Sequence, residues 1–220
     1  TTANLSIVAL PTGSGKTRVA QAAAWALRRQ GKGPALMISP LISLMDDQRA
    51  QFRVFSEDLA SDPDLCLHSG GDGFSTAFLT TAEVRRTDRL MIEMDRGNID
   101  LLCCSPETMM TRYDGMMWID KMTRMKNPVS MLIIDEAHIV GDWGATIRPD
   151  FQLLSWVRDR LLMANPDLRI VLMSATISRH EQEELKRIFF KTGMEHNETR
   201  VAKTRRDLYF HYERYDDNDP

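Results

Sequence analysis

Short apolar runs alternate with longer helical patterns along most of this chain, and this alternation restricts the fold more than any other feature of the sequence. The runs are rich in Val, Ile and Leu, which is typical of strands buried on both faces of a parallel sheet. They are Leu5–Leu10, Ala35–Ile38, Asp64–Leu67, Ile99–Cys104, Val129–Ile134 and Leu168–Met173. The helical patterns between them are Gly15–Arg29, Ile42–Phe55, Ala82–Arg96, Phe151–Ala164 and Arg179–Phe190. Together they predict a doubly wound α/β domain, with a mainly parallel β-sheet and helices on both faces.

The charge balance excludes a protein that binds nucleic acid through its overall charge. The chain of 220 residues carries 28 basic and 31 acidic side chains, for a net charge of -3 and an isoelectric point of about 6.0. Its length suits one large domain. Any contact with nucleic acid would therefore depend on local groups of residues rather than on the global field.

The cysteines and the distribution of apolar residues favour a cytoplasmic protein. None of the three cysteines, Cys66, Cys103 and Cys104, forms a pair at metal-ligand spacing, so we expect no zinc site. Cys103 and Cys104 fall in an apolar run and are predicted to be buried, free thiols in a reducing compartment. No apolar stretch approaches the roughly 20 residues of a membrane span. The first residues also lack the basic start and cleavage site of a signal peptide.

A glycine-rich loop follows the first apolar run and precedes an Ala-rich helical pattern. We call it the glycine loop; it consists of Pro11, Thr12, Gly13, Ser14, Gly15, Lys16 and Thr17. Glycines free the backbone to wrap its N–H groups around a phosphate, and the following helix N-terminus adds partial positive charge. This pattern assigns Lys16 to the β- and γ-phosphates of ATP and the Thr17 hydroxyl to Mg²⁺. One further glycine of the full pattern is replaced by Leu10, and the alternative is a chance glycine-rich turn.

Two adjacent acids, Asp135 and Glu136, follow the apolar run Val129–Ile134. Charges at the end of a buried strand are costly unless a cation meets them, and a nucleotide-bound Mg²⁺ would supply that charge. We expect Asp135 to hold the metal and Glu136 to position and deprotonate the attacking water. His138 can donate and accept hydrogen bonds, which suits a link between the nucleotide and a neighbouring segment. The alternative is that the two acids are merely solvated at the strand end.

The glycine loop and the sequence Asp135-Glu136-Ala137-His138 together resemble the superfamily 2 helicases of the Asp-Glu-Ala-His type. Three further segments are similar to the RecQ-like members of that group: Ser39–Gln48, Ser105–Glu107 and Ser174–Thr176. The resemblance implies nucleic-acid contacts at Pro40, Ser43 and Ser105. It also implies that Ser174 and Thr176 couple hydrolysis to strand movement. Ser39 or Ser43 has a second interpretation as a helix cap.

The segment Trp143–Phe151 resembles the aromatic-rich loop by which RecQ-like enzymes couple single-stranded DNA binding to ATP hydrolysis. Trp143 and Phe151 offer flat faces for base stacking, and Arg148 can meet a phosphate or a carboxylate. Ile147 stands where the family has another aromatic residue. The alternative is that Trp143 and Phe151 pack into the core beside the next helix.

The resemblance implies the first RecA-like motor domain of an ATP-dependent DNA helicase that uses ATP and Mg²⁺. We expect this domain to cover residues 1–207, with residues 208–220 beginning a linker to a second RecA-like domain that supplies the arginine finger. Single-stranded and duplex DNA are the expected partners. The alternatives are a translocase or remodeller that does not separate strands, an RNA helicase, and a non-catalytic nucleic-acid-binding module.

Overall fold

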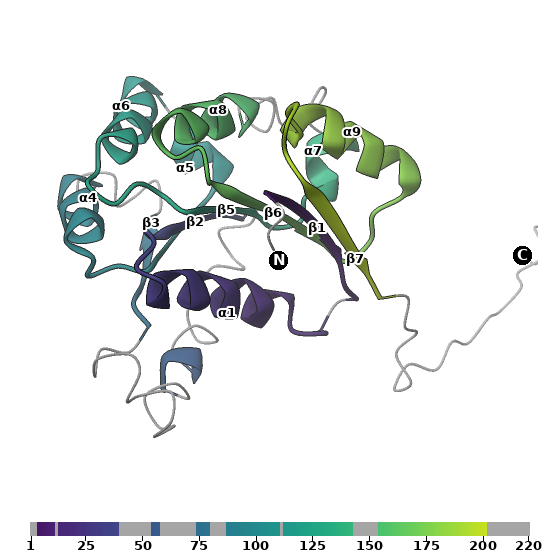
Figure 1. Ribbon diagram of the computed structural model, residues 1–220, viewed down its shortest axis with the longest axis horizontal. Coiled ribbons are helices and arrows are strands. Elements are labelled where there is room, and N and C mark those ends of the chain that lie inside the picture. Colours follow the sequence, from purple (N-terminus) through teal and green to yellow (C-terminus); the bar gives the residue numbers. More distant parts are fainter. Residues whose placement is uncertain are drawn as a thin grey trace, which may run out of the picture.

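A parallel sheet forms the centre of the molecule in the computed structural model (Figure 1). The structure describes residues 4–11, 13–39, 54–57, 74–79, 87–110, 112–142 and 154–201. Within these residues the sheet has seven strands in the order β3-β4-β2-β5-β6-β1-β7, and every pairing is parallel. The strands are β1 (Leu5–Ala9), β2 (Ala35–Ile38), β3 (Thr76–Leu79), β4 (Leu101–Cys104), β5 (Met131–Ile134), β6 (Arg169–Ser174) and β7 (His196–Arg200).

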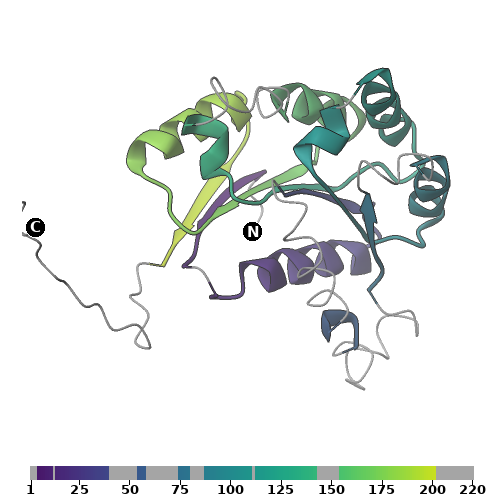
Figure 2. The ribbon, with the colours of Figure 1, turned by 180° about the vertical axis from the view of Figure 1, so that it is seen from behind.

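Helices cover both faces of this sheet, as Figures 1 and 2 show from opposite sides. Helix α1 (Lys16–Arg29) lies on one face. The other face carries α4 (Thr87–Arg96), α5 (Pro106–Met110), α6 (Arg112–Thr123), α7 (His138–Asp142), α8 (Leu154–Ala164) and α9 (Arg179–Phe189). The arrangement confirms the predicted doubly wound α/β class, and the described sheet is parallel throughout rather than mainly so.

Each central strand contributes side chains to two separate hydrophobic cores, because successive residues of a strand point to opposite faces. Met37 of β2 and Ile133 of β5 pack beneath α1, in the core that contains Ala20, Ala24 and Leu27 of that helix. Their strand neighbours, such as Ile38 and Ile134, pack on the other side against α6, α8 and α9. This burial on both faces explains why the central strands read as continuous apolar runs rather than as alternating ones.

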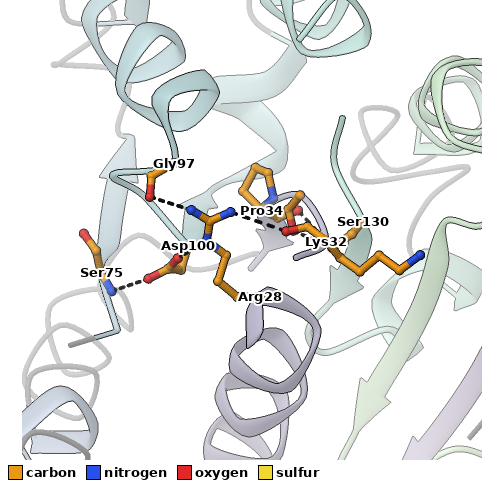
Figure 3. Close-up of polar contacts among 8 residues, drawn as sticks. Arg28, Lys32, Pro34, Ser75, Gly97, Asp100 and Ser130 are labelled. Atoms are coloured by element: carbon orange, nitrogen blue, oxygen red, sulfur yellow. Dashed lines mark hydrogen bonds and ion pairs between the residues drawn. The ribbon is translucent and has the colours of Figure 1, made fainter. Parts of the chain in front are cut away.

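A polar cluster ties the end of α1 to the start of β4 (Figure 3). Arg28 donates from Nε to Asp100 Oδ1 at 2.8 Å and from Nη2 to the Gly97 carbonyl at 2.8 Å. The other oxygen of Asp100 accepts the Ser75 N–H at 2.8 Å, just before β3. Gly97 has φ +83, and an added Cβ there would lie 2.3 Å from Arg28 Nη2. This cluster joins three segments at the edge of the sheet where the strands begin.

The predicted elements match the structure closely in the centre of the sheet. Five predicted runs correspond to β1, β2, β4, β5 and β6, and four helical patterns correspond to α1, α4, α8 and α9. The run Asp64–Leu67 and most of the pattern Ile42–Phe55 lie outside the described residues. The prediction missed the strands β3 and β7 and the helices α5, α6 and α7. The edge strand β7 has the sequence HNETR, entirely polar and exposed, so no apolar pattern marks it.

Cys103 and Cys104 are free and fully buried, as predicted. Burial raises the pKa of both thiols well above the ordinary value of 9.0, so they are protonated and act as small apolar side chains. Cys66 lies outside the described residues. Among the helices that the structure describes, none is long and apolar enough to cross a membrane.

Candidate functional site

Three neighbouring strands end at the same edge of the sheet and carry the candidate site. In the order β5-β6-β1, the acids follow β5, Ser174 ends β6, and the glycine loop follows β1. Parallel strands have their carboxyl ends at one edge, and the crevice outside that edge is where open α/β sheets bind ligands. Neighbouring strands lie about 4.8 Å apart, so β1 and β5 are separated by roughly 10 Å.

The end of β6 holds both flanking loops by successive backbone carbonyls. The Ser174 carbonyl accepts the N–H of Leu10 at 3.1 Å, at the entrance to the glycine loop. The Met173 carbonyl accepts the N–H of Ala137 at 2.8 Å, within the turn that carries the acids. On the far side, the Ile38 carbonyl at the end of β2 accepts the Asp135 N–H at 2.8 Å. The two motifs are therefore fixed to one another through a single strand.

The glycine loop has the backbone that its sequence predicts. Gly13 and Gly15 have φ of 77 and 88, in the left-handed region that residues with a Cβ rarely adopt. Ser14 closes the turn by donating its N–H and its Oγ–H to the Pro11 carbonyl, at 3.1 and 2.6 Å. Nothing lies within 4 Å of the position where a Cβ of Gly15 would stand. Thr12 is outside the described residues.

Helix α1 begins at Lys16 with the features of an anion-binding N-terminus. Its N-cap residue, Gly15, provides no side-chain cap, and its first turn contains no acidic residue. The helix dipole and the N–H groups of this turn are therefore not neutralised by a side-chain carboxylate of the turn. Lys16 reaches back along the loop, with Nζ 3.3 Å from the Leu10 carbonyl oxygen. Thr17 is the next residue of the same turn.

The turn after β5 fixes Asp135 and places Glu136 in a strained conformation. Asp135 is buried; its Oδ1 accepts the Glu136 N–H at 3.0 Å, and Ser39 Oγ lies 3.5 Å from its Oδ2. Glu136 has φ 49, which costs a non-glycine residue on the order of 1–2 kcal/mol. Such strain persists where the surrounding bonds determine the backbone, and it is concentrated at functional sites.

Ser174 connects the acid turn to the segment that follows β6. His138 Nδ1 lies 2.8 Å from Ser174 Oγ and 3.4 Å from Glu136 Oε2. Ser174 Oγ also donates to the Thr176 carbonyl at 2.8 Å. The buried Ser174 hydroxyl thus contacts both His138 and the backbone of Thr176, the second residue that the sequence predicts to act in coupling. The side chain of Thr176 itself is exposed.

The residues predicted to contact nucleic acid are mostly outside the described part of the chain. They are Pro40, Ser43, Trp143, Arg148 and Phe151. Ser105 is described and fully buried. Its Oγ accepts the Thr108 N–H at 3.1 Å and lies 3.0 Å from Thr108 Oγ1, which caps the short helix α5. The predicted nucleic-acid contact of Ser105 stays a prediction.

The residues of this edge fit a nucleotide and a divalent cation. An open, left-handed glycine turn, an uncapped helix N-terminus and a lysine suit a phosphate chain. Mg²⁺ at such sites takes one or two protein oxygens and completes its shell with phosphates and water. Thr17 and Asp135 are the two oxygen donors that the sequence assigns to the metal. No group of three or more His, Cys, Asp or Glu side chains forms a metal cluster in the described part of the chain.

Two buried polar side chains have surroundings that the sequence did not predict. Ser39 meets Asp135 across neighbouring strands, whereas the sequence suggested a helix cap for it. Gln21 is a fully buried polar residue on the sheet-facing side of α1. The only signal for Gln21 is a glutamine among alanines, four residues beyond Thr17.

The parallel sheet and the glycine loop together define an α/β fold of the P-loop nucleoside triphosphatase class. Solved structures agree with this fold. The Mycobacterium smegmatis helicase Lhr, bound to single-stranded DNA and AMP-PNP, has a TM-score of 0.62 and 23% identity and covers 91% of this chain and 24% of its own. The DUF1998 helicase MrfA, bound to DNA and AMPPNP, has a TM-score of 0.62 at 16% identity, covering 90% of this chain and 25% of its own.

The sequence comparison then identifies the family. The model of the DEAD/DEAH box helicase family matches residues 3–185, and the chain belongs to this family. It is 29% identical over 171 residues to the probable ATP-dependent DNA helicase RecS of Bacillus subtilis, covering 78% of this chain and 29% of RecS. It is 28% identical over 178 residues to the ATP-dependent DNA helicase RecQ of Synechocystis, covering 80% and 32%. These relatives confirm the RecQ-like resemblance, and the chain spans about a third of their length.

Proposed function

We propose that this chain is the nucleotide-binding motor domain of a RecQ-like, ATP-dependent DNA helicase. In this proposal it binds MgATP and couples hydrolysis to movement on single-stranded DNA and to duplex unwinding. The observation that carries the proposal is the attachment of the glycine loop and the acid turn to successive carbonyls of β6. This attachment brings phosphate-binding amides and two carboxylates to one edge of one sheet.

Each residue of the edge has a chemical task in this proposal. Lys16 and the N–H groups of Gly13–Thr17 bind the phosphates, while Thr17 and Asp135 hold the metal. The bound Mg²⁺ would neutralise charge on the phosphate oxygens. Glu136, 25% exposed and beside His138, accepts a proton from the attacking water. The left-handed backbone of Glu136 turns the chain directly after β5, and its carboxylate lies 3.4 Å from His138 Nδ1.

The coupling part of the proposal depends on Ser174. Its hydroxyl contacts His138 and the Thr176 carbonyl, so a shift of the acid turn would be transmitted to the segment after β6.

DNA as the nucleic acid is supported by the names of RecS and RecQ and by the DNA-bound Lhr and MrfA structures. The Trp143–Phe151 segment, with Pro40, Ser43 and Ser105, supplies the proposed DNA contacts.

Completion of the ATPase site requires groups that we place in a second RecA-like domain. We propose that residues 1–207 form the motor domain and that residues 208–220 begin the link to the second one. Transfer of the γ-phosphoryl group needs added positive charge, which arginine fingers supply and which is worth about 10³–10⁵ in rate. The 220 residues alone are therefore expected to bind ATP weakly and to hydrolyse it poorly.

The proposed function predicts that Lys16→Ala and Glu136→Gln in the full-length protein each abolish DNA-stimulated ATP hydrolysis. Lys16→Ala removes the cation that meets the phosphates, whereas Glu136→Gln keeps the shape of the side chain but cannot accept a proton. Release of phosphate with and without single-stranded DNA measures the effect. Lys32→Ala is the matched control, because Lys32 is exposed at the opposite edge of the sheet. Normal hydrolysis by Lys16→Ala or Glu136→Gln would reject the proposal, and a strand-displacement assay separates a helicase from a translocase.

A further inference from the structure

Gln21 is the most unusual buried side chain of α1. It is fully buried on the face that otherwise presents Ala20, Ala24 and Leu27 to the sheet. Within the part of the chain that the structure describes, neither its Oε1 nor its Nε2 has a hydrogen-bond partner. A buried amide without partners destabilises a folded protein, because its contacts with water are lost and not replaced. An apolar side chain of similar length would suit this position better on stability alone.

The helix geometry places this amide beneath the proposed metal-binding residue. Gln21 is four residues after Thr17, so the two side chains share one face of α1. Long side chains of a helix reach back toward its N-terminus, over the residue four positions earlier. The Gln21 side chain can therefore extend along α1 toward Thr17, although the structure has no hydrogen bond between these two described residues.

The position of Arg28 shows toward which strands the side of α1 that carries Gln21 is turned. Arg28, seven residues after Gln21 on the same flank, reaches Asp100 and Gly97 at the start of β4 (Figure 3). The flank is thus turned toward the side of β1 on which β5 and β2 also lie. Asp135 and Ser39 follow those two strands. The buried amide belongs to the same half of the molecule as the acids.

We infer that Gln21 is a positioning residue for the nucleotide-bound metal, and this inference rests on the proposed function. Its amide oxygen accepts the hydroxyl hydrogen of Thr17 when the hydroxyl oxygen holds Mg²⁺. A hydroxyl has one hydrogen and two lone pairs, so an oxygen that ligates a cation directs its hydrogen to an acceptor on the other side. Such outer partners orient metal ligands. The two oxygens of Asp135, the other residue proposed to hold the metal, face Ser39 Oγ and the Glu136 N–H.

The inference predicts opposite effects of Gln21→Met on stability and on metal-dependent binding. Without ligand, the chain gains stability, and its melting temperature rises by about 2–6 °C, because an unpartnered amide is replaced by a thioether. With ATP, the Mg²⁺ concentration for half-maximal binding rises about tenfold, because Thr17 has lost its acceptor. Thermal unfolding of the ligand-free chain and calorimetric titration of ATP at increasing Mg²⁺, with an EDTA series, measure the two effects.

Two further variants make the test specific. Thr76→Val removes another buried polar atom that has no hydrogen-bond partner among the described residues. It lies on β3, away from the site, so its loss should raise stability without changing the Mg²⁺ dependence. Thr17→Val removes the hydroxyl. Adding Gln21→Met to it should therefore cause no further rise in the Mg²⁺ concentration that half-maximal ATP binding needs. Gln21→Leu repeats the test with a different apolar shape.

Several outcomes would overturn the inference. The first is a Gln21→Met variant that needs the same Mg²⁺ concentration as the unsubstituted chain, or that loses ATP affinity equally in EDTA. The second is a double variant in which the effects of Gln21→Met and Thr17→Val on the required Mg²⁺ concentration add. The third is a lower melting temperature, or failure to fold, in both Gln21→Met and Gln21→Leu. A different result would count against the proposed function instead: no binding of MgATP by the unsubstituted chain, or binding that Lys16→Ala leaves unchanged.

Discussion

Ser174 is the residue through which most of the site is connected. Its carbonyl holds the entrance to the glycine loop, and its hydroxyl meets His138 at 2.8 Å and the Thr176 carbonyl at 2.8 Å. The backbone contact survives any substitution, whereas the two hydroxyl contacts depend on the side chain. Binding of nucleotide and coupling to DNA are therefore separable at this one position.

Ser174→Ala is expected to lower DNA-stimulated ATP hydrolysis of the full-length protein by about tenfold, while ATP affinity changes little. A buried hydrogen bond is worth about 1 kcal/mol, and 1.4 kcal/mol corresponds to a factor of ten in rate. Phosphate release with and without single-stranded DNA, together with equilibrium ATP binding, measures the separation. Ser155→Ala on α8 is the control. Equal losses in ATP affinity and in DNA stimulation would show that Ser174 does not act in coupling.

At the scale of elements, α9 is fixed at its N-terminus by a reciprocal pair of hydrogen bonds. Ser178 Oγ accepts the Glu181 N–H at 3.2 Å, and the Ser178 N–H donates to Glu181 Oε2. Burial alone raises the pKa of Glu181. The hydrogen bonds from Ser178 and the charges of His138 and His180 outweigh burial, so this pKa lies below the ordinary value of 4.5. The ionised carboxylate is therefore the form that stabilises the folded chain.

A pH dependence of stability follows from the lowered pKa of Glu181. A depressed folded-state pKa contributes stability that is present above the unfolded value of 4.5 and disappears as the pH falls through the folded value. The melting temperature of Glu181→Gln should be below that of the unsubstituted chain at pH 6, and the difference should shrink as the pH falls below 4.5. Glu183→Gln, an exposed neighbour, is the comparison. A difference that stays constant with pH would contradict the assignment of Glu181.

The Arg28 cluster predicts a second effect on stability. Arg28→Met removes the cation and leaves the nearly buried Asp100 carboxylate with the Ser75 N–H but without its charged partner. Breaking a buried ion pair lowers the free energy of unfolding by about 3–5 kcal/mol. Because Arg28 is partly exposed, we expect a loss of about 2 kcal/mol. This corresponds to a fall in melting temperature of about 4–8 °C. Arg29→Met is the control, because Arg29 is exposed and contacts only the Trp25 ring among the interactions described. Equal melting temperatures of Arg28→Met and Arg29→Met would show that Arg28 does not stabilise the fold through Asp100.

Local pattern predicted the elements that are buried on both faces, and it failed where tertiary context decides. Ala35–Ile38 matches β2 because a central strand must be apolar throughout. The sequence of β7 has no such constraint: its side chains are exposed, and it is a strand because its backbone pairs with β1. The same distinction holds at the site. The glycine loop and the acids follow local patterns, whereas the contact between Ser39 and Asp135 joins residues 96 positions apart.

At the scale of the whole molecule, the protein is a slightly acidic α/β domain with a net charge of -3. It has no overall positive field to hold DNA, so strand binding would depend on local contacts and on other parts of a longer protein. The chain covers 29% of RecS and 32% of RecQ of Synechocystis. The family and the fold are established for this domain, while duplex unwinding belongs to the proposed function.

The central claim is that the glycine loop and the acid turn bind one magnesium nucleotide together. A crystal structure of the chain with Mg²⁺ and a non-hydrolysable ATP analogue tests it most directly. We predict Lys16 Nζ on the β- and γ-phosphates, and a single cation between the phosphates, Thr17 Oγ1 and the Asp135 carboxylate. A nucleotide bound elsewhere, or a cation held by the phosphates and Thr17 with Asp135 turned away from it, would contradict the account.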